Sequence, residues 1–262
     1  MKKTFGMLIV GFVFCVIIGW AQQATPPAPE QKQSDAVAEK KPEITAEQVL
    51  EKYIEATGGR AAYQKLTSSV SKGTMEIVGQ NIRGTMETYA KAPTKFLLVQ
   101  NIDGIGQFLQ GYDGQVGWGQ DPFLGLRNLE GAELANFKRE ATFHADLKWR
   151  ELYEKAELIG TQKVGDRNTY VIRLTPTVGK PVTRYFDTET FLLVRSDVVS
   201  ETPYGTLNME SYPSDYRVVD GVKIPFQLVM KAPSGEMVMK LTEVKYNVEI
   251  DDAKFVKPAA KQ

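Results

Sequence analysis

The sequence predicts a mainly β protein of the α+β class, an antiparallel meander of about 11–12 strands that curls into a barrel or partial barrel. Apolar and polar residues alternate with a period of two from Val70 onward, as expected of strands with one buried face. Dipeptides such as Asp103-Gly104, Asp113-Gly114 and Asp220-Gly221 separate these segments and supply the positive φ that tight hairpin turns require. No strand–helix–strand alternation is present, which argues against a parallel sheet.

The start of the chain has the pattern of a secretory signal peptide over residues 1–21. Two lysines precede an apolar run over residues 5–20, and small residues stand at the two positions that a signal peptidase reads before cleavage after Ala21. The run is about 16 residues long, which is short for a membrane span. A lipid anchor on Cys15 is the alternative, but Phe14 stands where a lipobox requires a small residue. We therefore expect a soluble protein exported to the periplasm.

Composition predicts one folded domain after this leader. Residues 22–43 are rich in Pro, Ala and Gln with little to bury, so we expect a disordered linker, with a partner-docking tail as the alternative. Residues 44–258 then form a domain without disulfides, because Cys15 is the only cysteine of the 262 residues. The 32 basic and 32 acidic residues give a net charge of +0 and no basic stripe, which excludes nucleic acid as a partner. We expect a monomer.

The first element of the domain is a helix that begins at Thr45. Thr45 and Gln48 have the spacing of a capping box. Val49, Leu50, Tyr53 and Ile54 then follow at helical spacing, and Gly58-Gly59 ends the helix. An amphipathic helix of this kind is expected to pack on a sheet.

The strands follow in two groups separated by a second helix over residues 129–143. That helix places Leu134, Phe137 and Ala141 on one face. The expected strands are 68–78, 82–90, 95–102, 105–110, 116–120, 153–164, 168–175, 182–186, 192–202, 206–219, 223–231 and 236–248.

Four segments carry a resemblance to a known family. They are residues 92–96 (APTKF), 112–122 (YDGQVGWGQDP), 185–195 (YFDTETFLLVR) and 215–225 (DYRVVDGVKIP). With them, residues 44–256 resemble the LolA/LolB-type periplasmic lipoprotein carriers and the related outer-membrane lipoprotein-sorting proteins. The resemblance implies an unclosed half-barrel, with helices covering its concave face and an apolar cavity between them. In that family the cavity holds the acyl chains of lipoproteins during transfer between membranes, and no cofactor takes part.

The chain departs from the family pattern at two positions. Ala92 stands where carriers of the LolA type have an arginine that helps to hold the lid closed, and Phe191 replaces an expected glycine. Arg83 on the preceding strand is a candidate to lie near Ala92. The first departure puts lipoprotein handover in doubt, while binding of an apolar ligand stays compatible with the sequence.

Alternation and the resemblance together select the residues expected to contact an apolar ligand. Phe96 and Leu98 share one face of a strand, and Met237 and Met239 alternate with Val238 and Lys240. Each residue alone has core packing as its ordinary role, and only the set beneath a helical lid favours a pocket. The predicted ligand-binding residues are Phe96, Leu98, Phe108, Trp118, Phe123, Leu134, Phe137, Met237 and Met239.

No motif in the sequence predicts an enzyme. His144 is the only histidine, which excludes a multi-histidine metal site, and we expect it at a helix end or on the surface. Asp251-Asp252 is expected to cap a terminal turn. We therefore predict a carrier of lipoprotein acyl chains, lipid or another apolar ligand. The alternative is an interaction module that uses the same concave sheet to bind or sense membrane proteins of the envelope.

Overall fold

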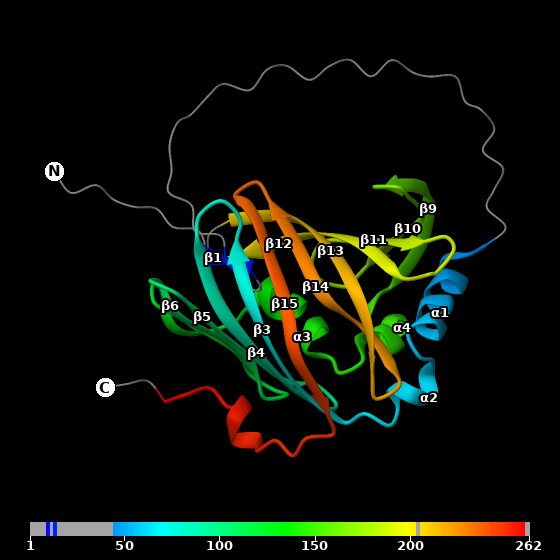
Figure 1. The fold of residues 1–262 in the computed structure, drawn as a ribbon. Coiled ribbons are helices and arrows are strands. Elements are labelled where there is room, and N and C mark those ends of the chain that lie inside the picture. The colour runs from blue at the N-terminus through cyan, green and yellow to red at the C-terminus, as the bar shows by residue number, and fades with distance from the viewer. Residues whose placement is uncertain (1–8, 11–12, 15–43, 203–204, 260–262) are drawn as a thin grey trace.

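The computed structural model describes residues 9–10, 13–14, 44–202 and 205–259 (Figure 1). The expected leader (1–21) and linker (22–43) therefore lie outside the described residues, except for two short strands. These strands, β1 (Ile9–Val10) and β2 (Val13–Phe14), form an antiparallel ladder of their own, and β1 lies against β12.

One antiparallel sheet of thirteen strands makes up the body of the protein, and it does not close into a barrel. The spatial order is β8-β7-β6-β5-β4-β3-β15-β14-β13-β12-β11-β10-β9. The first half contains β3 (Ser68–Ile77), β4 (Ile82–Lys91), β5 (Lys95–Ile102), β6 (Gly106–Tyr112), β7 (Gly117–Asp121) and β8 (Gly125–Asn128). The second half contains β9 (Lys155–Val164), β10 (Arg167–Thr175), β11 (Val182–Asp187), β12 (Leu193–Thr202), β13 (Gly205–Val219), β14 (Val222–Ala232) and β15 (Gly235–Tyr246).

This strand order forces the chain to cross one face of the sheet. The first half grows outward from β3 to the edge strand β8, and the second half begins at the opposite edge with β9. The connection runs through α3 (Gly131–Ala141), η1 (Ala145–Lys148) and α4 (Trp149–Leu152). Helix α3 contacts both β7 and β12, which lie near opposite ends of the strand order. The sheet therefore bends around α3, and Figure 1 shows α3 and α4 together on one face.

The expected fold class is confirmed, and each of the twelve expected strands matches an observed strand to within two residues at either end. Strand β8 was not expected, because its four residues follow directly on the turn at Pro122 and are too short to show alternation. The strand expected from residue 153 begins at Lys155, since residues 149–152 form helix α4. The helix expected over 129–143 is α3, which is shorter by two residues at each end.

The N-terminal helices cover the second half of the sheet. Helix α1 (Ala46–Ala56) has the expected capping box, in which the Thr45 amide donates to Gln48 Oε1 at 2.8 Å and the Gln48 amide donates to Thr45 Oγ1 at 3.2 Å. Its apolar face packs on side chains of β10 and β11, and the short α2 (Arg60–Tyr63) follows it. The members of this core cluster include Val49, Leu50, Ile54, Ile172, Leu174 and Phe186.

The C-terminal segment packs on the other face of the sheet. After β15, the 3₁₀ helix η2 (Asp252–Phe255) places Phe255 against Trp118 and Leu97. The Trp118 indole N–H donates to the Phe255 carbonyl at 2.9 Å, and the side chain is fully buried. Its ring lies directly over Gly111, where an added Cβ would be 2.3 Å from the indole. Trp118 is thus held from both sides.

We predict that Gly111→Ala destabilises the protein by about 1–3 kcal/mol, because the added methyl group overpacks a ring that cannot move away. Chemical denaturation followed by tryptophan fluorescence measures the change. Gly119→Ala is the matched control on the neighbouring strand, since its Cβ meets Leu129 at an ordinary 3.6 Å. Equal stability losses in the two variants would contradict the close packing of the Trp118 ring on Gly111.

Candidate functional site

The concave face carries six methionines, which we call the methionine wall: Met75, Met86, Met209, Met230, Met237 and Met239. They are all the methionines of the described residues. Strand pairing places Met230 opposite Met237 and Met239 opposite Met75. Ile77, Ile102, Phe108 and Leu207 belong to the same cluster. Thioether side chains therefore form one apolar cluster across β3, β4, β13, β14 and β15, in which Met86 is half-buried and the other five are buried.

The wall lies on the same face as α3. The Gln100 amide contacts Met75 Sδ at 3.9 Å, and Gln100 alternates along β5 with Phe96 and Leu98 on the same face. Phe96 in turn meets Phe137 of α3 edge-on, with ring centroids 5.8 Å apart. The wall and the residues that pack on α3 therefore lie on the same face of the sheet.

Helix α3 packs closely on the first half of the sheet. Leu134 and Phe137 join a cluster with Phe96 and Tyr112. Gly117 on β7 permits this approach, because a Cβ there would lie 2.5 Å from Leu134 Cδ1. This cluster fills one end of the concave face, and the methionine wall lies beside it.

The structure brings most of the predicted ligand-binding residues to this face. Phe108, Met237 and Met239 belong to the wall cluster, while Phe96, Leu134 and Phe137 belong to the α3 cluster. Leu98 is buried on the same face of β5. Phe123 lies in the β7–β8 turn, 48% exposed, and its ring stacks on Phe108 with centroids 6.2 Å apart.

Trp118 is the exception. Its cluster with Leu97, Ile250 and Phe255 lies on the outer face, so it does not share a face with Phe108. The reason is register: β7 pairs Trp118 with Gly111 and Gly117 with Tyr112, which puts Gly117 rather than Trp118 on the side of α3.

Arg83 does not lie near Ala92. Arg83 is at the start of β4 and pairs with Glu76 at 3.6 Å, whereas Ala92 follows the end of that strand. Phe191, the second departure from the family pattern, keeps a positive φ of 56° and stacks on Tyr170 with centroids 6.0 Å apart. Neither feature places a cation beside Ala92.

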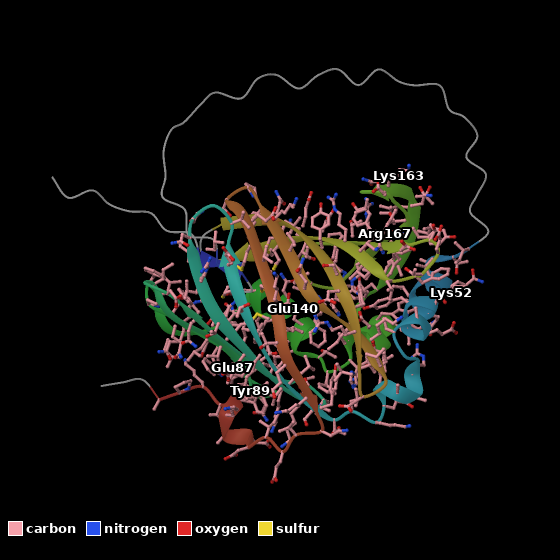
Figure 2. All side chains as sticks on the ribbon, in the orientation of Figure 1. Lys52, Glu87, Tyr89, Glu140, Lys163 and Arg167 are labelled. Carbon is pink, nitrogen blue, oxygen red and sulfur yellow. The ribbon has the colours of Figure 1, made fainter. Side chains whose placement is uncertain are left out.

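A cavity of about 140 Å³, lined by both charged and apolar side chains, lies between α3 and strands β11 and β12, and we call it the α3 cavity. Its lining includes Arg139 and Glu140 of α3, Tyr153, Arg184 of β11, and Ser196 and Val198 of β12. Glu140 lines this cavity and is exposed to solvent. Figure 2 shows Glu140 near the centre of the fold.

The charges around the α3 cavity are of both signs. Arg184 pairs with Asp146 of η1 at 2.8 Å; burial opposes its charge, but Asp146 and nearby groups hold its pKa above the ordinary value. Burial raises the pKa of Glu140 to about 8, and Arg139 offsets part of that rise. This shift favours the neutral form of Glu140.

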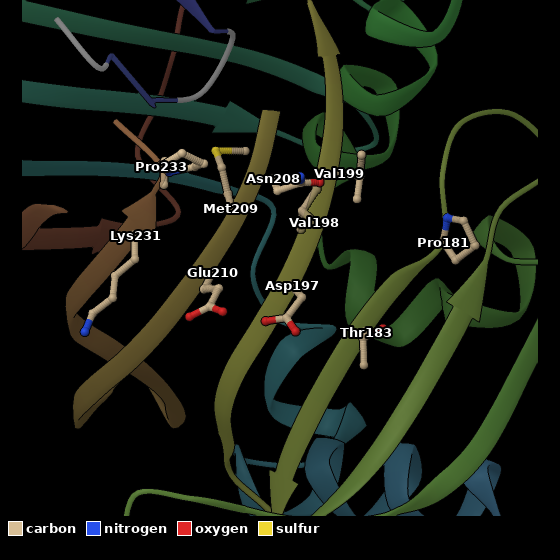
Figure 3. A pocket seen from close by; sticks show the side chains of 11 residues that line it. Pro181, Thr183, Asp197, Val198, Val199, Asn208, Met209, Glu210, Lys231 and Pro233 are labelled. Carbon is tan, nitrogen blue, oxygen red and sulfur yellow. The ribbon is translucent and has the colours of Figure 1, made fainter. Parts of the chain in front are cut away.

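The outer face has a pocket of about 480 Å³ over β11–β14, drawn in Figure 3. Asp197 and Glu210 on its floor each pair with Arg195 at 2.6 Å. The two carboxylates also accept from tyrosine hydroxyls, Tyr185 at 2.8 Å and Tyr212 at 2.5 Å. These groups satisfy one another, which is the arrangement of a structural network on a sheet surface.

Residues considered for catalysis have structural contacts. The His144 ring nitrogen Nε2 lies 3.1 Å from the Leu66 carbonyl, and the ring packs on Phe143 and Tyr63. Asp251 accepts from the Ala253 amide at 2.9 Å and caps η2 as expected.

The described part of the chain contains no group of three or more His, Cys, Asp or Glu side chains placed to hold a metal. Nor does it contain a helix that could span a membrane.

The sequence interpretation missed several residues of this region. Met75, Met86, Met209 and Met230 sit on the same side of their strands as Met237 and Met239, and a parity count over all strands would have found them. Arg139 and Glu140 gave no such signal, because only the crossover of α3 brings them to β11 and β12.

The fold is similar to that of several solved structures. A protein of the DUF1329 family from Desulfovibrio piger matches 80% of this chain and 97% of its own, with a TM-score of 0.57 and 18% identity. A LolA superfamily protein from Nitrosomonas europaea matches 82% of this chain and 98% of its own, with a TM-score of 0.55 and 17% identity. This is a LolA-type fold.

A putative outer membrane lipoprotein-sorting protein domain from Vibrio parahaemolyticus also has this fold, with a TM-score of 0.53 and 13% identity over 80% of this chain and 97% of its own. No protein-family model matches the sequence, and the search of curated proteins gives no match. The resemblance expected from the sequence is thus confirmed at the level of the fold.

We predict that Glu140→Gln raises the melting temperature at pH 7–8 and leaves it unchanged near pH 4. The folded protein holds the Glu140 proton up to about pH 8, whereas the unfolded chain releases it at about pH 4.3. Wild-type stability is therefore lost as the pH rises through this window, and the amide removes that loss. Differential scanning calorimetry across the pH range measures it.

Glu133→Gln is the control on the same helix. Glu133 pairs with Arg127 at 2.6 Å, so its amide removes an ion pair and gives no rise in melting temperature at neutral pH. A pH-independent effect of Glu140→Gln on the melting temperature would contradict the raised pKa of Glu140 in the folded protein.

Proposed function

We propose that this protein is a non-catalytic carrier that binds an acyl chain or another apolar ligand on its concave face, beneath α3. The observation that carries this proposal is the methionine wall, which gathers six thioether side chains on one face of the sheet. Methionine is flexible and polarisable, so a buried cluster of this kind can rearrange around chains of varied length and shape. Each methylene buried there contributes about 0.8 kcal/mol.

The fold supports the same proposal. A LolA superfamily protein and an outer membrane lipoprotein-sorting domain share this architecture. With the signal pattern of residues 1–21, they favour a periplasmic carrier that acts on lipoprotein acyl chains or lipid in sorting to the outer membrane. We propose that it acts as a monomer. Ala92 stands where LolA-type carriers have the lid arginine. The competing function is therefore an interaction module for envelope membrane proteins.

We predict that the protein purified from its native envelope carries an acyl species in stoichiometric amount. Mass spectrometry of an organic extract measures it, with a periplasmic protein of the same preparation as the control for free lipid. An empty protein that retains one defined polypeptide through purification would instead support the interaction module.

We also predict that Met86→Glu lowers the affinity for the neutral fluorescent probe N-phenyl-1-naphthylamine by about tenfold or more, because an apolar ligand would desolvate the new charge. Met86 is only partly buried at the margin of the wall, which favours folding of the variant. Fluorescence titration measures the affinity.

Thr85→Glu is the matched control. Thr85 is the preceding residue on β4, is exposed and faces the other side of the sheet. It adds the same charge without touching the wall, so the probe affinity is expected to stay at the wild-type value. Equal affinities in the two folded variants would overturn the assignment of the binding face.

A further inference from the structure

The α3 cavity differs in chemistry from the methionine wall beside it. Three cationic side chains line it from three elements: Arg139 from α3, Lys180 from the β10–β11 connection and Arg184 from β11. Arg184 is paired with Asp146, and the Tyr53 hydroxyl also lies 3.4 Å from that carboxylate. The other polar side chains in the lining are Asn136, Tyr153, Ser196 and Glu140, whose pKa is raised.

Arg139 is the lining arginine that forms no ion pair with a described carboxylate, although Glu140 beside it on α3 attracts its charge. Its guanidinium donates to the Val178 carbonyl at 2.7 Å and to the Asn136 side chain, both neutral acceptors. No described carboxylate lies within ion-pair distance of it. Burial lowers the pKa of Arg139, as expected of a partly desolvated cation. These contacts hold the guanidinium in place without neutralising it, so a bound anion would gain a charge-assisted hydrogen bond.

The cavity adjoins the methionine wall through β12 and β13. Val198 lines the cavity and is the cross-strand partner of Met209, a member of the wall. Met209 also belongs to the cluster that contains Met230 and Met237. A volume of about 140 Å³ accommodates a carboxylate or a phosphate, but a hydrocarbon chain would have to extend outside it, toward the wall.

We infer that the α3 cavity binds the anionic head group of an acyl amphiphile, with Arg139 as its main cation and the hydrocarbon chain on the methionine wall. This inference rests on the proposed function and narrows its ligand class to amphiphiles with a carboxylate or phosphate head. Such a molecule needs two neighbouring sites: charged side chains that bind its polar head and apolar side chains that bind its hydrocarbon chain.

Glu140 gives this site a pH dependence. The charged and titratable groups that face it are Arg139 on its own helix and Lys180, Arg184 and Tyr153 on other elements, with Asp146 held by Arg184. In its protonated form Glu140 donates a hydrogen bond to an anion, whereas its carboxylate repels one. Affinity for the anionic amphiphile is therefore expected to fall as the pH rises through about 8.

Titration with cis-parinaric acid and with its methyl ester tests the inference, because the two fluorescent probes share a chain and differ only in head-group charge. We expect wild-type protein at pH 7 to bind the acid about tenfold or more tightly than the ester. Arg139→Gln is expected to remove that preference and leave ester binding unchanged. Lys138→Gln is the matched control, since Lys138 is the preceding, exposed residue and loses the same charge.

Two further arms use the same probes. Glu140→Gln is expected to abolish the fall in acid affinity above pH 8. Oleoyl lysophosphatidic acid is expected to displace the probe, whereas inorganic phosphate is not; displacement by phosphate alone would make the cavity a free-anion site and overturn the inference. The comparison of acid and ester binding uses wild-type protein alone. It therefore tests the inference even if Arg139→Gln fails to fold.

The outcomes distinguish a failure of the head-group site from a failure of the proposed function. Equal binding of acid and ester by the wild type overturns the head-group site and leaves the apolar carrier in place. Failure of both probes to bind overturns the proposed function itself. A preference for the acid that survives in folded Arg139→Gln overturns the role of Arg139.

Discussion

The structure depends on one topological constraint: the chain must travel from one edge of the sheet to the other between β8 and β9. Both edges belong to the same open sheet, and the connecting residues include the apolar side chains Leu134 and Phe137, which must be buried. Crossing the concave face satisfies both requirements, because α3 then packs on β7 and β12 at once. The bend of the sheet and the α3 cavity follow from this crossing.

Local signals in the sequence predicted the elements well. The Thr45–Gln48 pair marks the start of α1 because a capping box involves only four consecutive residues. Turn dipeptides and alternation locate twelve strands, since both depend on neighbouring residues alone. Strand β8 has four residues and one turn on each side, which is too little for a pattern to be visible.

Features that depend on distant pairing were not predictable in the same way. The face on which Trp118 lies is decided by its pairing with Gly111 and by its hydrogen bond to the carbonyl of Phe255, far along the chain. Met237 and Met239 could be assigned to one face, but their meeting with Met75 requires the β15–β3 ladder. Arg139 and Glu140 are ordinary helix residues in the sequence, and only the crossover gives them a cavity to line.

The pairing of β3 with β15 has a consequence for how the molecule forms. These strands lie at the centre of the sheet, yet they are the first and last strands of the folded domain. The two halves are joined only when the end of the chain is present, so contact order is high and folding is expected to be slow. A chain arranged in this way cannot complete its central ladder until its last strand has been synthesised.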